Sequence, residues 1–227
     1  LVETYIKHLQ SKKIFQKGIF ITFEGGEGSG KSTQIKLLSK LLTEQNISHV
    51  LTREPGGTEI GEQIRKILLQ GNIDKLDSYS EFLCFAASRR EHLKKIILPA
   101  LNKNKIVICD RFLDSSYVYQ GMVGGLKREI ITKIHDDFCF KKYPDLTILL
   151  NVNPKVGLER KNKTTLIENR FENFKNEFHE LVQTKFLELA NINSHRYRVI
   201  NADNEKNFIF NEIIEQIKHF FILNKNE

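Results

Sequence analysis

The sequence predicts an α/β protein whose mostly parallel, five-stranded sheet is covered by helices on both faces. Apolar runs of strand length alternate with longer segments whose apolar residues have helical spacing, and this alternation is typical of parallel sheets. A glycine-rich stretch directly follows the first apolar run, and polar side chains follow others. Ligands of such sheets bind beyond the carboxyl ends of the strands, so we expect a site there.

The predicted strands are the apolar runs at 19–23, 47–52, 105–110, 145–152 and 196–201. Apolar spacing predicts helices within 35–45, 59–70, 78–103, 127–138, 172–190 and 207–221. Residues 160–170 are polar and poorly patterned, which favours a mobile loop. A chain of 227 residues suits one core, so we predict a single domain at 18–223, after an N-terminal extension of unknown role at 1–17.

Charge and cysteine content narrow the class of protein. The chain has 35 basic and 28 acidic residues and a net charge of +7, which suits nucleic acid, membrane or small anionic ligands. Because the lysines are scattered, we favour a nucleotide site and expect neither nucleic acid nor a membrane as partner. Three widely spaced cysteines and no run of 18 apolar residues predict a cytoplasmic protein without disulfides.

Residues 23–33, FEGGEGSGKST, contain the phosphate-binding pattern G-x-x-x-x-G-K-[ST]. Glycines let successive N–H groups converge on an anion, and the helix that begins near Lys31 adds its positive end. Lys31 would reach the outer phosphates of ATP, and the Ser32 hydroxyl would take a position on Mg²⁺. The expected ATP-binding residues are Gly25, Gly26, Glu27, Gly28, Ser29, Gly30, Lys31, Ser32 and Thr33. A carboxylate repels phosphate, so Glu27 indicates a further partner.

Two segments at strand ends also carry candidate groups. TREPGGT at 52–58 carries Arg53, but alone this segment favours a plain turn with exposed Arg53 and Glu54. Asp110 ends a buried strand and would support Mg²⁺, while Arg111 can bridge phosphoryl groups; a strand-end salt bridge is the alternative.

Polar and aromatic groups suited to a nucleobase occur in two places. Ser115, Ser116, Tyr119 and Gln120 offer hydroxyl and amide groups, although Tyr119 also suits a core position. Phe85 and Arg89 stand four residues apart on one helical face, where a ring and a guanidinium can hold a flat base. As an isolated pair they more often belong to an ordinary amphipathic helix.

In this order and spacing, FEGGEGSGKST, TREPGGT, FLCFAASR and DRFLDSSYVYQG resemble the bacterial type of thymidylate kinase, a family of P-loop nucleoside monophosphate kinases. The resemblance implies a three-layer P-loop kinase fold with a short mobile lid at about 160–172. It also implies transfer of the γ-phosphoryl group of ATP, with Mg²⁺, to thymidine 5′-monophosphate (dTMP) for dTTP biosynthesis. A homodimer is the family pattern.

The resemblance assigns roles to the candidate residues. Lys31 matches the phosphate-loop lysine, Arg111 the arginine between donor and acceptor phosphates, and Arg53 the residue that holds the acceptor phosphate. Phe85 would stack on thymine and Arg89 would bond its O4, with Ser116 and Gln120 beside the base. Glu27 would face the 3′-hydroxyl, and Tyr119 would lie beneath the sugar.

The lid departs from the family pattern. Its catalytic arginine would be Arg160 or Arg170, but Asn169 replaces the usual Asp, and Lys161 or Lys163 could contribute instead. NADN at 201–204 resembles the loop that flanks adenine.

Two rival functions stay open at this point. Another monophosphate such as deoxyuridylate could be the acceptor, since a missing methyl gives only about 10–200-fold discrimination. A P-loop ATPase that binds nucleic acid has only the +7 charge in its favour. For the kinase reaction we expect in-line transfer without a strong base or a covalent enzyme intermediate, because the acceptor is already a phosphate.

Overall fold

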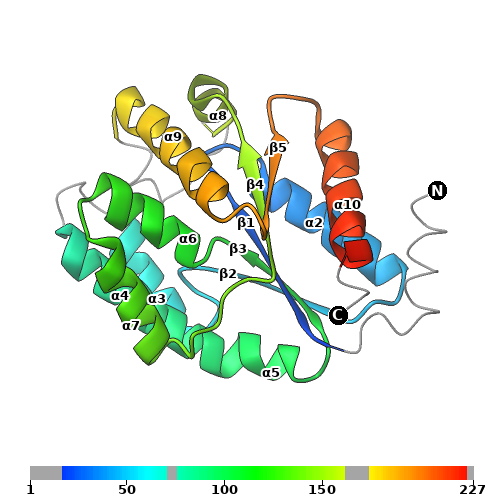
Figure 1. Ribbon diagram of the computed structural model, residues 1–227, viewed down its shortest axis with the longest axis horizontal. Helices are drawn as coiled ribbons and strands as arrows, with labels where there is room; N and C mark the ends of the chain where they lie inside the picture. The colour runs from blue at the N-terminus through cyan, green and yellow to red at the C-terminus, as the bar shows by residue number, and fades with distance from the viewer. Residues whose placement is uncertain (1–16, 71–75, 162–173, 224–227) are drawn as a thin grey trace.

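A computed structural model of the chain describes residues 17–70, 76–161 and 174–223. Within them, five parallel strands form one sheet in the order β2-β3-β1-β4-β5, with helices on both faces (Figure 1). The strands are β1 (Ile19–Glu24), β2 (His49–Arg53), β3 (Ile106–Asp110), β4 (Leu146–Asn151) and β5 (Tyr197–Asn201). The predicted fold class and all five predicted strands are confirmed, with small shifts at their ends.

The strand registers bring the candidate residues to one edge of the sheet. Asp110 at the end of β3 lies opposite Phe23 of β1 on one side and Arg53 of β2 on the other. Asn151 and Asn201 end β4 and β5 in register with each other. The chain therefore leaves the sheet at a common edge, where the phosphate loop begins.

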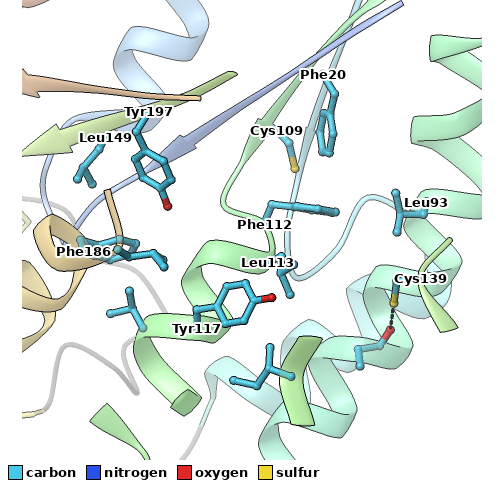
Figure 2. Close-up of a cluster of buried hydrophobic side chains, with 14 of the residues drawn as sticks. Phe20, Leu93, Cys109, Phe112, Leu113, Tyr117, Cys139, Leu149, Phe186 and Tyr197 are labelled. Carbon is cyan, nitrogen blue, oxygen red and sulfur yellow. Dashed lines mark hydrogen bonds between the residues drawn. The ribbon is translucent and has the colours of Figure 1, made fainter. Parts of the chain in front are cut away.

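Side chains of the central strands β1, β3 and β4 alternate between two cores. One core holds Ile21 and Phe23 of β1 and lies under α2 (Lys31–Glu44) and α10 (Lys206–Leu223). The other holds Phe20 and lies under the helices of the opposite face, including α4 (Ser78–His92) and α9 (Asn176–Ile192) (Figure 2). Because both faces of the central strands β1, β3 and β4 are buried, these strands have the nearly continuous apolar runs seen in the sequence.

Further helical segments flank the sheet, and two helices, α3 (Glu59–Leu69) and α4, begin at capping residues. Thr58 caps α3, since its hydroxyl accepts from the Gly61 N–H, and Asp77 caps α4. The remaining segments are η2 (Leu93–Ile97), α5 (Leu98–Leu101), α6 (Leu113–Ser116), η3 (Tyr117–Val123), α7 (Arg128–Phe138) and α8 (Pro154–Lys161). η2 and η3 are π-helical, and η2 continues α4 into α5.

Two helical segments were not predicted. Residues 113–123 form α6 and η3, although their polar residues break the apolar spacing, and 154–161 form α8. The start of the segment predicted as a loop at 160–170 is thus the last turn of a helix. The rest of the predicted lid and residues 1–16 lie outside the described residues. Among the described helices, we find none long and apolar enough to span a membrane.

Candidate active site

A cavity of about 1010 Å³ opens at the carboxyl edge of the sheet. Most of the predicted site residues that the structure describes line it, from the phosphate loop and Arg53 to Phe85, Arg89 and Gln120. Gly25 and Gly26 do not line the cavity, and Arg170 lies outside the described residues. The fold thus gathers segments that are far apart in the sequence into one site.

The phosphate loop requires glycine at close approaches. Gly28 has a φ of 64°, and a Cβ there would lie 1.8 Å from the carbonyl oxygen of Gly157 in α8. Gly25 has a φ of 138°, and a Cβ there would lie 2.4 Å from the Leu150 carbonyl oxygen. Gly25 therefore lets the loop pack against β4, whereas Gly28 lets it pack against α8, which precedes the predicted lid.

Lys31 lies folded over this loop. Its Nζ donates to the carbonyl oxygens of Gly25 at 3.0 Å and Gly26 at 2.9 Å, and to Ser29 Oγ at 3.1 Å. Burial, together with the nearby charge of Arg111, lowers the pKa of Lys31 to about 8. A phosphate anion beside this amine would favour its charged form.

Ser32 and Asp110 form the candidate metal position. The Ser32 hydroxyl donates to Asp110 Oδ2 at 3.0 Å, which joins the start of α2 to the end of β3. Among the described residues, no three or more His, Cys, Asp or Glu side chains group as a metal site. One hydroxyl and one carboxylate fit Mg²⁺, which keeps several waters and takes its other ligands from substrate phosphates.

Arg111 lies at the centre of the site. Its Nη2 donates to Glu27 Oε1 at 2.7 Å and its Nη1 to Ser115 Oγ at 3.2 Å, while its guanidinium carbon lies 5.4 Å from the centre of the Tyr119 ring. Burial opposes its charge, but Tyr119 and the carboxylates of Glu27 and Glu24 outweigh burial and hold the pKa of Arg111 above its usual value. Arg111 therefore stays charged where a phosphoryl group would pass.

Glu24, which was not predicted as a site residue, supports Arg111 through Ser115. It is fully buried at the end of β1, where it accepts from the Phe112 N–H at 2.8 Å and from Ser115 Oγ at 2.7 Å. Burial and the neighbouring Asp114 raise the pKa of Glu24 to about 7. Ser115, predicted to contact the substrate, thus links Glu24 to Arg111 at the cavity wall.

Arg53 lines the cavity, and about half of its side chain is exposed. Its Nη2 donates to Glu62 Oε2 at 2.8 Å, and Glu62 Oε1 accepts from the Gly57 N–H at 3.1 Å. Burial works against the charge of Glu62, but the bonds from Arg53 and Gly57 hold its pKa below the usual value. Arg53 is therefore held in place by a carboxylate from α3 yet stays accessible.

The base-recognition candidates lie opposite, between α4 and η3. Arg89 is almost fully buried; its Nη2 donates to Ser116 Oγ at 3.0 Å, and its guanidinium lies over the Phe112 ring at 5.2 Å. Gln120 Nε2 donates to Glu81 Oε1 at 2.6 Å. Phe85, one turn before Arg89, is half-buried and lines the same cavity.

Arg160 contacts the predicted adenine loop. Its Nη1 donates to the Ala202 carbonyl oxygen at 2.7 Å and its Nη2 to that of Asp203 at 3.3 Å. Arg160 also lines the cavity. Of the two candidate lid arginines, Arg160 is the one within the described residues, and it joins α8 to the loop after β5.

Several residues of the site escaped the sequence reasoning. They are Glu24, Glu54, Glu62, Glu81, His92 and Gly157, and each contacts a predicted site residue or the segment that carries one. Glu24 could have been found as a lone carboxylate at the end of an apolar strand. Glu62 lies only nine residues from Arg53, although no pattern in the sequence pairs the two. The others give no local signal, because their partners are distant in the sequence.

A phosphate loop that directly follows β1, joined through Arg111 to the base-recognition candidates in the same cavity, is the arrangement of P-loop kinases that act on nucleoside monophosphates. The family model that matches is thymidylate kinase, over residues 23–213. The chain therefore belongs to the thymidylate kinase family.

Individual relatives agree with this assignment. Thymidylate kinase of Symbiobacterium thermophilum is 47% identical over 184 residues, which cover 81% of this chain and 85% of that protein. The Ruegeria pomeroyi thymidylate kinase is 40% identical, with 87% of this chain and 93% of the relative covered. The crystal structure of thymidylate kinase from Ehrlichia chaffeensis superposes with a TM-score of 0.72 at 39% identity, covering 88% of this chain and 99% of that one.

Proposed function

We propose that this chain transfers the γ-phosphoryl group of ATP to dTMP and yields thymidine 5′-diphosphate and ADP, a step towards dTTP. It is an ATP-dependent nucleoside monophosphate kinase. The observation that carries the proposal is the Arg111–Glu27 pair, at 2.7 Å, within one cavity that holds both the phosphate loop and the Phe85–Arg89 pocket.

The residues of the cavity divide into donor, transfer and acceptor groups. The loop N–H groups and Lys31 hold the ATP phosphates, and Arg111 neutralises charge between donor and acceptor. Arg53 holds the acceptor phosphate, Phe85 and Arg89 hold the base with Ser116 and Gln120, and Glu27 faces the 3′-hydroxyl. The acceptor is already an oxyanion, so alignment and charge neutralisation suffice and no side chain acts as a strong base.

Ser32 and Asp110 would hold Mg²⁺, whose charge would neutralise the phosphate oxygens during transfer. Arg160 secures the adenine-side loop through the Ala202 carbonyl, which favours Arg170 as the arginine that enters from the lid. A homodimer and a cytoplasmic location complete the proposal, by likeness to the family.

The test is ADP formation with ATP, Mg²⁺ and each of five acceptors: the monophosphates of thymidine, deoxyuridine, deoxycytidine, deoxyguanosine and deoxyadenosine. We expect rapid turnover with dTMP, and Arg111→Ala should lower kcat by about 10²–10³-fold or more. Arg128→Ala, which removes an exposed arginine from the start of α7, is the matched control and should match the wild type. ATP hydrolysis that ignores every acceptor would reject the kinase function.

A further inference from the structure

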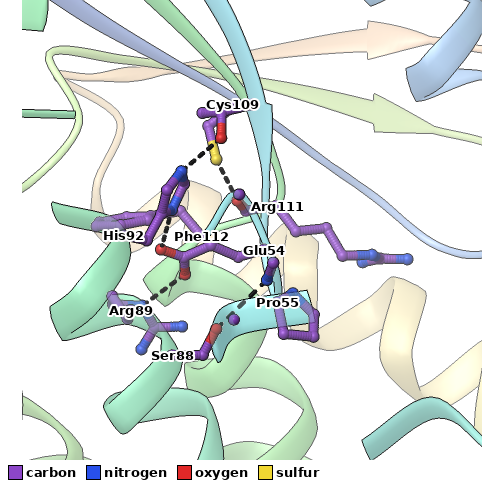
Figure 3. Close-up of polar contacts among 12 residues, drawn as sticks. Glu54, Pro55, Ser88, Arg89, His92, Cys109, Arg111 and Phe112 are labelled. Carbon is purple, nitrogen blue, oxygen red and sulfur yellow. Dashed lines mark hydrogen bonds and ion pairs between the residues drawn. The ribbon is translucent and has the colours of Figure 1, made fainter. Parts of the chain in front are cut away.

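A buried polar network lies directly behind Arg89. Arg89 Nε donates to Glu54 Oε2 at 2.7 Å, and the other carboxylate oxygen of Glu54 lies 3.0 Å from His92 Nδ1 (Figure 3). His92 Nε2 lies 2.5 Å from Thr52 Oγ1 at the end of β2. Glu54, Arg89 and His92 are all nearly inaccessible to solvent. The mechanism above uses Arg89 alone among these residues.

The chemistry of the network assigns a donor to each contact. A carboxylate only accepts, so His92 Nδ1 carries a hydrogen and donates to Glu54. In the neutral ring, Nε2 then accepts from the Thr52 hydroxyl. The ring is thus fixed from both ends, and its orientation follows from its partners.

The turn after β2 is shaped to admit this ring. Gly57 has a φ of 77°, and a Cβ at that position would lie 2.6 Å from the ring of His92. The neighbouring Gly56 N–H donates to Ser88 Oγ of α4 at 3.3 Å. One face of α4, with Ser88, Arg89 and His92, therefore packs against the turn that follows Arg53.

Holding Glu54 in place sets the direction of Arg89. Within the described part of the chain, the hydrogen bonds of Arg89 use Nε and Nη2, and Nη1 is left for a ligand in the cavity. A guanidinium is a rigid fork, so fixing Nε and Nη2 fixes Nη1. Without the bond from His92, Glu54 would lose the restraint on its second oxygen.

We propose that His92 is a positioning residue for base recognition, which holds Glu54 so that Arg89 presents its free N–H group to a pyrimidine carbonyl. The inference rests on the proposed function and deepens it. Glu54 transmits the constraint, and His92 itself does not touch the nucleotide.

Two substitutions at His92 separate positioning from packing. His92→Asn keeps an amide nitrogen where Nδ1 donates to Glu54, whereas His92→Gln places its amide nearer Thr52 and loses the bond to Glu54. We expect His92→Asn to stay close to the wild type and His92→Gln to lower kcat/KM for dTMP by about 10–100-fold, through KM. A role in packing alone would affect both variants alike.

The choice of nucleotide gives a second readout. Thymine and uracil both carry a carbonyl at position 4, whereas cytosine carries an amino group there. His92→Gln should therefore weaken binding of dTMP and deoxyuridine monophosphate equally and narrow the preference over deoxycytidine monophosphate, as titration calorimetry would measure. The KM for ATP should not change.

Glu54→Gln provides an independent test if a His92 variant does not fold. The glutamine side chain has one acceptor oxygen for the two donors Arg89 Nε and His92 Nδ1. Glu54→Gln should therefore narrow the preference for dTMP over deoxycytidine monophosphate, as His92→Gln should. The proposal would be overturned if His92→Asn and His92→Gln had the same kcat/KM for dTMP. It would also be overturned if Glu54→Gln kept the full wild-type preference for dTMP over deoxycytidine monophosphate. A wild-type protein that does not use dTMP would instead overturn the proposed function.

Discussion

At the scale of single residues, Lys31 combines a buried position with a charge that its ligand needs. Three oxygens of the loop accept from its amine, yet burial lowers its pKa to about 8. The neutral form of the Lys31 amine is therefore more favoured in the folded protein than it is in water. A bound phosphate, in contrast, favours the charged form. Binding of ATP should take up a proton at a pH above about 8.

We predict that ATP affinity falls as pH rises above about 8, by up to about tenfold for each pH unit. The Kd for ATP, measured between about pH 7 and 9.5, would test this. Lys31→Arg should flatten the profile, because a guanidinium stays charged throughout the range. A wild-type Kd that stays constant across the range would contradict the assignment of Lys31.

Tyr119 is held rigidly where the sugar is expected. Its ring contacts the Arg111 guanidinium and lies 6.1 Å from the ring centres of Phe178 and Phe186 in α9. Burial raises the pKa of Tyr119 to about 12, so its hydroxyl is neutral in use. A ring fixed on several sides cannot move aside for a 2′-hydroxyl.

Tyr119→Ala should therefore raise activity on ribothymidine monophosphate relative to dTMP by about tenfold or more. Kinetics with the two substrates would measure the ratio. Tyr119→Phe keeps the ring and should keep the wild-type ratio. An unchanged ratio in Tyr119→Ala would show that another group excludes the ribose.

At the scale of elements, a buried ion pair ties the helix under the active site to the sheet. Arg196, just before β5, donates to both oxygens of Asp114 in α6, at 2.6 and 2.8 Å, and to Thr147 Oγ1 of β4 at 2.6 Å. Both side chains are buried. Removal of one partner leaves an unpaired buried charge, which costs more than the pair itself contributes.

Arg196→Met should lower the free energy of unfolding by about 3–5 kcal/mol, and adding Asp114→Leu should recover part of that loss. Urea unfolding of the single and double variants measures this coupling. Lys133→Ala, which breaks the exposed pair between Lys133 and Asp137 on α7, is the control and should have no measurable effect. Additive losses in the double variant would argue against the coupling.

The burial of each helix and strand also explains which of them could be predicted from the sequence. The central strands β1, β3 and β4 are buried on both faces and give nearly unbroken apolar runs. The edge strands β2 and β5 are partly exposed but still carry shorter apolar runs, so all five strands were predicted. In α6, Asp114, Ser115 and Ser116 face a polar interior, so the apolar spacing that identifies a helix is missing. The network at Arg89 joins residues 35 and 38 positions apart, and no local pattern encodes such pairs.

At the scale of the whole molecule, one side exposes apolar residues on adjacent helices. Ile60 and Ile67 lie one above the other on α3, and Tyr79 and Leu83 do so on α4, all at least 45% exposed. α4 carries Phe85 and Arg89 to the cavity, while α10 covers the other face of the sheet (Figure 1). If two copies of the chain associated through α3 and α4, the interface would include the helix that carries Phe85 and Arg89.

We predict a homodimer formed through α3 and α4, which light scattering at micromolar concentration would detect. Ile67→Lys and Leu83→Lys should yield monomers, because each would bury a charge between apolar faces. Phe208→Lys, at a similarly exposed position on α10, should leave the dimer intact. A wild-type monomer, or a dimer that tolerates both lysines, would place the interface elsewhere. Because α4 carries Arg89, we also expect the monomers to have a higher KM for dTMP with an unchanged KM for ATP.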